Sequence, residues 1–265
     1  MHRLPTLRSL AALAALSLAA CEDSTAPGTS ASVQLAAPAV AGASAETPTG
    51  LSIAGTNGTL LITDMRLVVD EFELKRAGVA GCDDDLVGGD DDDCEEFESN
   101  LFVADVPLGS GTVTVANDRI PAGAYTAMEF EVKDLFVDDG DDDDMLRAAR
   151  IAELLTQLRQ TYADWPAGAS MMIAGTFTPT GGAPQPFRVY FDADVEVETT
   201  FSPALTIDGG SQGVTIELRP DLWFKRLDGT VRNLAAWNYA TTSSLVEFEV
   251  EIEGGLEGGI EIEHD

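Results

Sequence analysis

The sequence predicts a mostly β fold, an antiparallel β-sandwich with one inserted α-helix. Apolar and polar residues alternate with period two in many short segments, which is typical of strands with one buried and one wet face. Residues 145–162 instead carry apolar residues at helical spacing. The hydrophobic content of 45% indicates a globular body. About 215 residues follow residue 49, enough for one sizeable core.

Residues 1–20 have the form of a signal peptide. Arg3 and Arg8 make a positively charged start, and the apolar run at residues 10–20 is too short to cross a bilayer as a helix. The run ends in Leu18-Ala19-Ala20-Cys21, which resembles the bacterial lipobox. We expect cleavage before Cys21, lipidation of that cysteine, and a body in the periplasm or on the cell surface of a bacterium. An ordinary secretory signal with a chance cysteine is the alternative.

Residues 21–49 are predicted to be a flexible tether. They are rich in Ala, Ser, Thr, Pro and Gly and bury too little apolar area to offset the entropy of ordering. Residues 50–265 are then a single β-sandwich domain, which the tether holds away from the membrane.

Strands are expected wherever the alternation is clean. The longest is residues 187–197, where six apolar residues alternate with polar ones. The segments with this pattern or a similar one are 60–64, 66–74, 101–106, 112–115, 128–132, 171–177, 187–197, 214–218 and 246–252. Residues 245–265 also fit a helical stripe, but their four glycines oppose a helix and favour a strand.

The inserted helix is predicted over residues 145–162. Ile151, Leu154 and Leu158 share one face, and Tyr162 and Trp165 continue it. Asp144 is available as the N-cap.

Part of the chain is similar to a known family. Residues 58–74, the VPLG sequence at 106–109 and residues 120–135 run in an order that resembles the bacterial envelope lipoproteins called domain of unknown function 4382. Pro121-Ala122-Gly123-Ala124-Tyr125 matches that family's step into a strand. Thr63-Asp64 matches part of its early turn, whereas Met65 and Arg66 replace the Ala-Pro that follows. The resemblance covers about residues 58–220 and implies a β-sandwich and an envelope location, without an assigned activity.

Composition excludes several classes of function. The formal charge is −31, and loss of Arg3 and Arg8 with the signal would make it −33, which argues against nucleic-acid and anionic-lipid binding. The two histidines are His2, in the signal, and His264, at the tail. A Ser-His-Asp or Cys-His arrangement inside the fold is therefore not expected, nor is a zinc site with several His ligands.

Two acid-rich segments of the sequence are predicted to form loops. Residues 82–98 hold ten acids and residues 134–144 hold seven. Ca²⁺ takes six to eight oxygen ligands in flexible geometry, which such loops supply, although neither has EF-hand spacing. The candidate ligands are Asp83, Asp84, Asp85, Asp90, Asp91, Asp92, Asp93, Asp138, Asp139, Asp141, Asp142, Asp143 and Asp144. The alternative is a pair of solvated loops, with Asp141 to Asp144 complementing a helix N-terminus.

A disulfide is predicted between Cys82 and Cys94. After lipidation of Cys21 they are the only cysteines left, an even number in an oxidising compartment. Free thiols are the alternative.

These features predict a non-catalytic, membrane-tethered envelope lipoprotein that binds divalent cations or a partner. A carbohydrate-binding module or a carboxylate-dependent glycosidase is the alternative, because Trp223, Phe224, Trp237 and Tyr239 could stack on sugar rings. Exposure of Trp223 and Trp237 discriminates between these functions. No feature identifies a protein or glycan partner.

Overall fold

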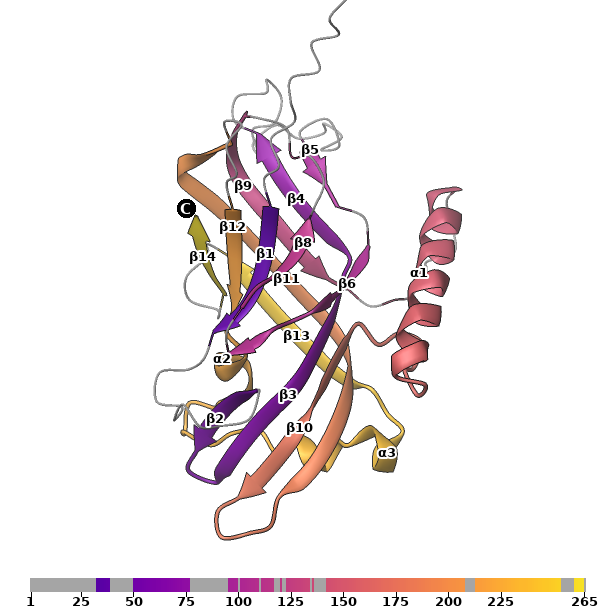
Figure 1. Cartoon of the computed structure of the whole chain (residues 1–265), viewed down its shortest axis with the longest axis vertical. Helices are drawn as coiled ribbons and strands as arrows, with labels where there is room; N and C mark the ends of the chain where they lie inside the picture. Colours follow the sequence, from indigo (N-terminus) through magenta and orange to yellow (C-terminus); the bar gives the residue numbers. More distant parts are fainter. Residues whose placement is uncertain are drawn as a thin grey trace, which may run out of the picture.

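Two β-sheets packed face to face form the body of the protein (Figure 1). The computed structural model describes residues 32–38, 50–76, 95–99, 101–109, 111–116, 120, 123–133, 135, 142–207, 213–253 and 260–264. Within these residues the larger sheet has nine strands and the smaller has five. The predicted mostly β, sandwich-like fold is therefore confirmed.

The larger sheet is built around two long stretches of chain. Its strands are β2 (Leu51–Gly55), β3 (Gly58–Val69), β4 (Glu71–Arg76), β5 (Glu95–Glu98), β6 (Phe102–Asp105), β9 (Gly123–Val132), β10 (Met171–Pro179), β11 (Gln185–Ile207) and β13 (Val246–Glu253). Only Asp70 separates β3 from β4, and β11 is 23 residues long. The other strands pair along these two.

The smaller sheet covers one face of the larger one. Its strands are β1 (Ser32–Pro38), β7 (Leu108–Gly109), β8 (Val113–Ala116), β12 (Gly213–Leu218) and β14 (Ile260–His264). Val33 and Leu35 of β1 and Ile216 and Leu218 of β12 are fully buried and belong to the same core as the inner face of the larger sheet. This is the sandwich core that the alternating pattern predicts.

Among the described strands three pairs are parallel, which differs from the predicted antiparallel order. β13 pairs parallel with β11, and β1 pairs parallel with both β12 and β7. Parallel neighbours need a crossover of a dozen or more residues. Residues 208–245 supply one between β11 and β13, and they include three short helices, α2 (Pro220–Phe224), η2 (Leu234–Trp237) and α3 (Tyr239–Thr242).

The predicted helix is present, and it lies in a segment that connects two strands, β9 and β10, which pair along the same edge of β11. β9 pairs antiparallel with residues 195–207 of β11, and β10 pairs antiparallel with residues 185–191 of the same strand. Both lie on the side of β11 opposite to β13. The two strands therefore act as one strand interrupted by residues 133–170, which contain α1 (Asp142–Thr161). Ser170 closes the gap, because its hydroxyl bonds both the N–H and the carbonyl of Ala193 at 2.9 Å.

α1 packs on the outer face of the larger sheet. Its Ile151, Leu154 and Leu158 are buried, and they form a second core with Val68, Leu101, Leu135, Tyr162, Trp165, Ala169, Met172 and Tyr190. The helix begins at Asp142, three residues before the predicted start, so Asp144 lies in its first turn and is not the N-cap. Acids in a first turn complement the positive end of the helix dipole, which accounts for the earlier start.

Two further predictions need correction. Residues 32–38 of the predicted tether form β1, because Val33 and Leu35 alternate with polar or small residues and fill the core, while the rest of 21–49 lies outside the described residues. The last residues of the predicted acidic loop 82–98 form β5, which pairs with β4 and buries Phe97.

The predicted strand at the C-terminus is confirmed as β13 and β14. Among the described residues, no helix is both long and apolar enough to cross a membrane.

Candidate functional site

Rows of glutamates run across three neighbouring strands of the larger sheet. In the register of β4, β9 and β11, Glu73 is opposite Glu129 and Glu129 is opposite Glu198. One step along, Glu71 is opposite Glu131 and Glu131 is opposite Glu196. Paired positions share a side of the sheet. These six residues, Glu71, Glu73, Glu129, Glu131, Glu196 and Glu198, are called the glutamate face below.

The local sequence explains this placement. On β9, Met128, Phe130 and Val132 are fully buried in the core, so Glu129 and Glu131 between them turn to the outer side. On β11, Val195 and Val197 are likewise buried in the core, so Glu196 between them also turns to the outer side. The β13 register also places Glu251 and Glu253 opposite Glu196 and Glu198. The outer side of this part of the sheet is therefore acidic across adjacent strands.

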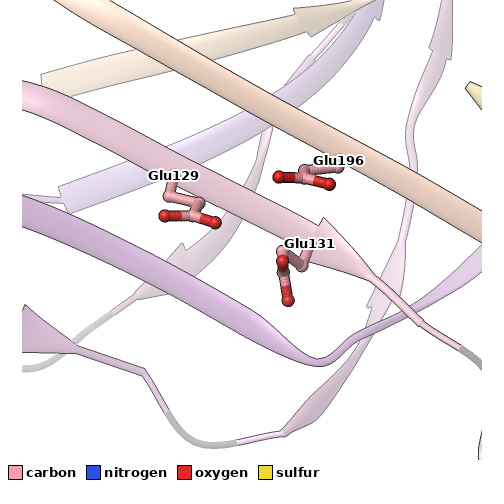
Figure 2. Close-up of side chains that lie close together, drawn as sticks. All are labelled: Glu129, Glu131 and Glu196. Carbon is pink, nitrogen blue, oxygen red and sulfur yellow. The ribbon is translucent and has the colours of Figure 1, made fainter. Parts of the chain in front are cut away.

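Three of these carboxylates converge. One carboxylate oxygen from each of Glu129, Glu131 and Glu196 lies within 4.8 Å of the others, and Figure 2 shows the three groups turned toward a common space. Ca²⁺ binds oxygens at 2.3–2.6 Å, so oxygens on opposite sides of the ion are about 4.6–5.2 Å apart. The three oxygens thus lie close enough together to bind one such ion.

Two lysines partly neutralise the glutamate face. Lys75 Nζ lies 3.0 Å from Glu129 Oε2, and Lys133 forms an ion pair with Glu131. Like charges directly opposite each other destabilise a sheet, and Glu71, Glu131 and Glu196 lie opposite one another in such a row. A bound dication would relieve several of these repulsions at once.

Glu131 is the most constrained of the three converging groups. It is only 4% exposed, whereas Glu196 is exposed. Burial raises the pKa of Glu131 above its usual value, Lys133 opposes this, and the charges of Glu71 and Glu129 raise it further. Ionisation of Glu131 therefore costs more free energy in the folded protein than in the unfolded chain.

Glu131→Gln is expected to raise the melting temperature at pH 7 in the absence of divalent cations. The pKa of Glu131 is higher in the folded state than in the unfolded state, so its protonated form favours folding. Its contribution to the unfolding free energy is therefore fully present below the ordinary glutamate pKa, about 4.3, and is lost as the pH rises through the folded-state pKa. The gain should therefore shrink and vanish as the pH falls below about 4. Thermal melts across this pH range measure it, with exposed Glu153→Gln on α1 as control. A loss of stability at pH 7 would show that the ion pair with Lys133 dominates.

The acidic segments predicted as metal ligands lie mostly outside the described residues. This holds for Asp83 to Asp85, Asp90 to Asp93, Asp138, Asp139 and Asp141, whereas Asp142 to Asp144 start α1. The chain leaves β4 at Arg76 and leaves β9 at Val132. Arg76 is opposite Tyr125, seven residues before Val132, so the two points are at opposite ends of this antiparallel pair, roughly 20–24 Å apart. The glutamate face lies between the two points of attachment.

The cysteine predictions also concern residues outside the described part. Cys21, Cys82 and Cys94 all lie there, so lipidation and the disulfide stay predictions. Lys75 of β4 is opposite Glu95 of β5, so the segment that holds Cys82 and Cys94 starts and ends at the same end of this strand pair.

The four aromatic residues singled out for sugar stacking divide into two pairs. Trp223 and Phe224 are buried in the core, Trp223 at 7% exposure, and cannot present a flat ring to solvent. Trp237 and Tyr239 are half-buried, and the ring of Tyr239 packs edge-on against Tyr190 at 5.0 Å. Trp237 packs against the sandwich core, whereas Tyr239 packs against the second core beneath α1.

A second polar cluster fastens the end of α1 to the sheet. The hydroxyl of Tyr162 donates to Asp64, and Arg66 bonds Asp64 at 3.0 Å. The guanidinium groups of Arg66 and Arg188 both lie over the Tyr162 ring, at 5.6 and 5.4 Å. Burial, with the hydrogen bond to Asp64, raises the pKa of Tyr162 to about 12. These groups satisfy one another, which indicates a structural role.

Comparison with known proteins gives no relative: no family model, no curated protein and no solved structure matches the chain. The fold and the glutamate face therefore define the protein only as a mostly β protein with an acidic sheet face.

Proposed function

We propose that the protein is a non-catalytic, lipid-anchored protein of the bacterial cell envelope whose acidic sheet face takes up divalent cations, with Ca²⁺ preferred. The Leu18-Ala19-Ala20-Cys21 sequence supports the anchor. The observation that carries the binding function is the convergence of Glu129, Glu131 and Glu196 on one space.

The chemistry of the site favours Ca²⁺ over Mg²⁺. The three carboxylates come from two rigid strands, and water completes the coordination on the exposed side of Glu196. Mg²⁺ demands near-ideal octahedral geometry at 2.0–2.1 Å and gives up its water reluctantly. A site with only three protein ligands is weak, comparable to the extracellular modules that bind Ca²⁺ at about 10⁻⁴–10⁻³ M. Such an affinity suits a protein exposed to the medium.

Millimolar Ca²⁺ is expected to stabilise the fold. Calcium at about 10 mM, on the order of 10 to 100 times this dissociation constant, adds roughly 1.5–3 kcal/mol of unfolding free energy. For a domain of this size that raises the melting temperature by about 5 °C. Thermal melts with Ca²⁺, Mg²⁺ or EDTA, at ionic strength matched with NaCl, measure it.

The control for this melt is a pair of charge-matched variants. Glu131→Gln combined with Glu196→Gln removes two of the three converging carboxylates and should abolish the Ca²⁺ shift. Glu153→Gln combined with Asp228→Asn removes two exposed acids elsewhere, on α1 and on the 225–231 hairpin, and should keep it. An equal shift in both variants would place any binding away from the glutamate face.

A further inference from the structure

One edge of the larger sheet lies at β13. Among the described strands, β13 pairs only with β11, to which it runs parallel (Figure 1). A strand at the edge of a sheet presents a row of main-chain N–H and C=O groups on its outer flank. An extended segment of another protein can pair with such a row as an additional strand. The flank of β13 that faces away from β11 can therefore accept a further strand.

A largely apolar pocket of about 340 Å³ lies at this edge, on the core side of β13. Phe248 faces the core, so the side chains of Glu247 and Glu249 on either side of it turn to the outer side. These two glutamates nevertheless border the pocket, which they can do only with their main chain. Apart from Arg232, the remaining residues of the wall are apolar or aromatic, namely Phe191, Leu222, Trp223, Phe224, Trp237, Val246 and Phe248. The pocket can therefore accept an apolar side chain from a strand added beside β13.

Leu222 of α2 is an exposed apolar residue at this pocket. It is 50% exposed, whereas its neighbours Trp223 and Phe224 are buried. Leu227, the other exposed large apolar residue of the described part of the chain, does not border the pocket. The exposed apolar surface of Leu222 and the edge of β13 thus lie at the same place in the fold. An added strand would cover both.

The charges around the edge select the chemistry of the added strand. On the outer side Glu247 is opposite Asp192, and Glu249 is opposite Asp194. Opposite charges in adjacent strands stabilise a sheet and like charges destabilise it, so the outer side favours basic side chains. On the core side Arg232 disfavours basic side chains, and the aromatic wall favours apolar ones. A strand that fits both sides alternates basic and apolar residues.

We propose that β13 docks an extended segment of a partner protein, in which basic and apolar residues alternate, as an added strand of the larger sheet. The basic side chains lie beside Glu247 and Glu249, and an apolar side chain enters the pocket. A second copy of the chain paired through β13 would bring the glutamates of two such strands side by side, which is unfavourable. This docking goes beyond cation binding and requires no bound ion.

The test is a titration of fluorescently labelled peptides with the full-length chain in EDTA, followed by fluorescence anisotropy. The first peptide has four Lys-Val repeats, the second has the same composition as two Lys-Lys-Val-Val repeats, and the third has four Glu-Val repeats. The first should bind at least tenfold more tightly than the second, and the third should not bind. No binding of the first peptide would show that the glutamates only protect the edge from aggregation. Equal binding of the first two would show unspecific attraction of cations, and either result would overturn the proposal.

N-methylated peptides test the main-chain pairing separately from the charge. In an added strand, alternate residues direct their N–H groups to the neighbouring strand and the others direct theirs away. Of two Lys-Val peptides that are N-methylated either at the lysines or at the valines, one should therefore lose binding and the other should keep it. Equal behaviour of the two peptides would contradict strand addition. Displacement of the unmethylated peptide by formation of a dimer, measured by sedimentation, would instead assign the edge to a second copy.

Matched variants locate the binding on the protein. Glu249→Lys should weaken binding of the Lys-Val peptide about fivefold or more, because it places like charges side by side. Glu153→Lys makes the same change at an exposed position on α1 and should bind as the parent does. Leu222→Ser should also weaken binding, whereas Leu227→Ser, at a fully exposed position outside the pocket, should not. Equal binding by both members of each pair would contradict docking at β13.

Discussion

Replacing Cys21 by serine is expected to abolish incorporation of labelled palmitate into the protein. The lipoprotein-processing enzymes attach lipid to the thiol, which serine lacks, so no anchored form can be made. The chain should then accumulate as an uncleaved or soluble precursor. Expression in a bacterium with radioactive or clickable palmitate, followed by fractionation of membranes, measures the outcome.

The other two cysteines are the natural controls for this experiment. Cys82→Ser and Cys94→Ser should both keep the label, because neither follows an apolar run with small residues. Palmitate that persists in the Cys21→Ser variant would remove the lipid anchor from the proposed function. It would leave the cation-binding face untouched, since that face is argued from the fold alone.

Trp165→Ala is expected to cost about 3–5 kcal/mol of unfolding free energy, the usual range for loss of a buried large aromatic. Trp165 is 1% exposed, and its ring packs against Tyr162 at 6.0 Å and Tyr190 at 5.2 Å. Its indole N–H donates to the carbonyl of Ala169 at 3.0 Å. The substitution therefore removes the centre of the contact between α1 and the sheet, and the melting temperature should fall by about 10 °C.

Trp165→Phe should recover a large part of this loss, because it keeps a buried aromatic ring and removes only the hydrogen bond and the part of the indole that exceeds a phenyl ring. Urea unfolding of the three proteins gives the free energies. A loss below about 1 kcal/mol for Trp165→Ala would contradict the packing of α1 on the outer face, since it would match a surface position.

The pattern of the sequence predicts which residues face inward, but it does not predict which strands are neighbours. Alternation along 187–197 places Val195 and Val197 inside and Glu196 outside, and the structure agrees. The neighbours of Glu196 lie far away in the chain, at Glu131 on one side and in β13 on the other. The glutamate face is therefore invisible from any single segment, although each of its strands was predicted.

The acid-rich segments attract notice because their charge is concentrated along the chain. The glutamate face has a similar concentration of charge, but it is spread over β4, β9 and β11 and arises only through their register. The sequence does hold a signal for the glutamate face, because Glu71, Glu129 and Glu196 each occupy a polar position in a strand with an alternating apolar and polar pattern. Pairing of those strands was the missing information.

Composition misleads where small residues take structural positions. β1 lies in a segment rich in Ala, Ser and Pro, and its few apolar side chains, Val33 and Leu35, are nonetheless fully buried. Pairing on both sides, with β12 and β8, supplies the backbone hydrogen bonds that stabilise it. The predicted start of α1 is three residues late, because a run of acids is typical of a loop. In the structure Asp142 to Asp144 form the first turn of the helix.

Calorimetric titration of Ca²⁺ into the full-length chain tests the central claim most directly. The parent protein should bind Ca²⁺ with a dissociation constant of about 10⁻⁴–10⁻³ M, and Mg²⁺ more weakly. Glu131→Gln combined with Glu196→Gln should lose at least tenfold in affinity, while the charge-matched pair Glu153→Gln and Asp228→Asn should bind as the parent does. Equal affinity in the two double variants, or no Ca²⁺ binding by the parent, would contradict a cation site on the glutamate face.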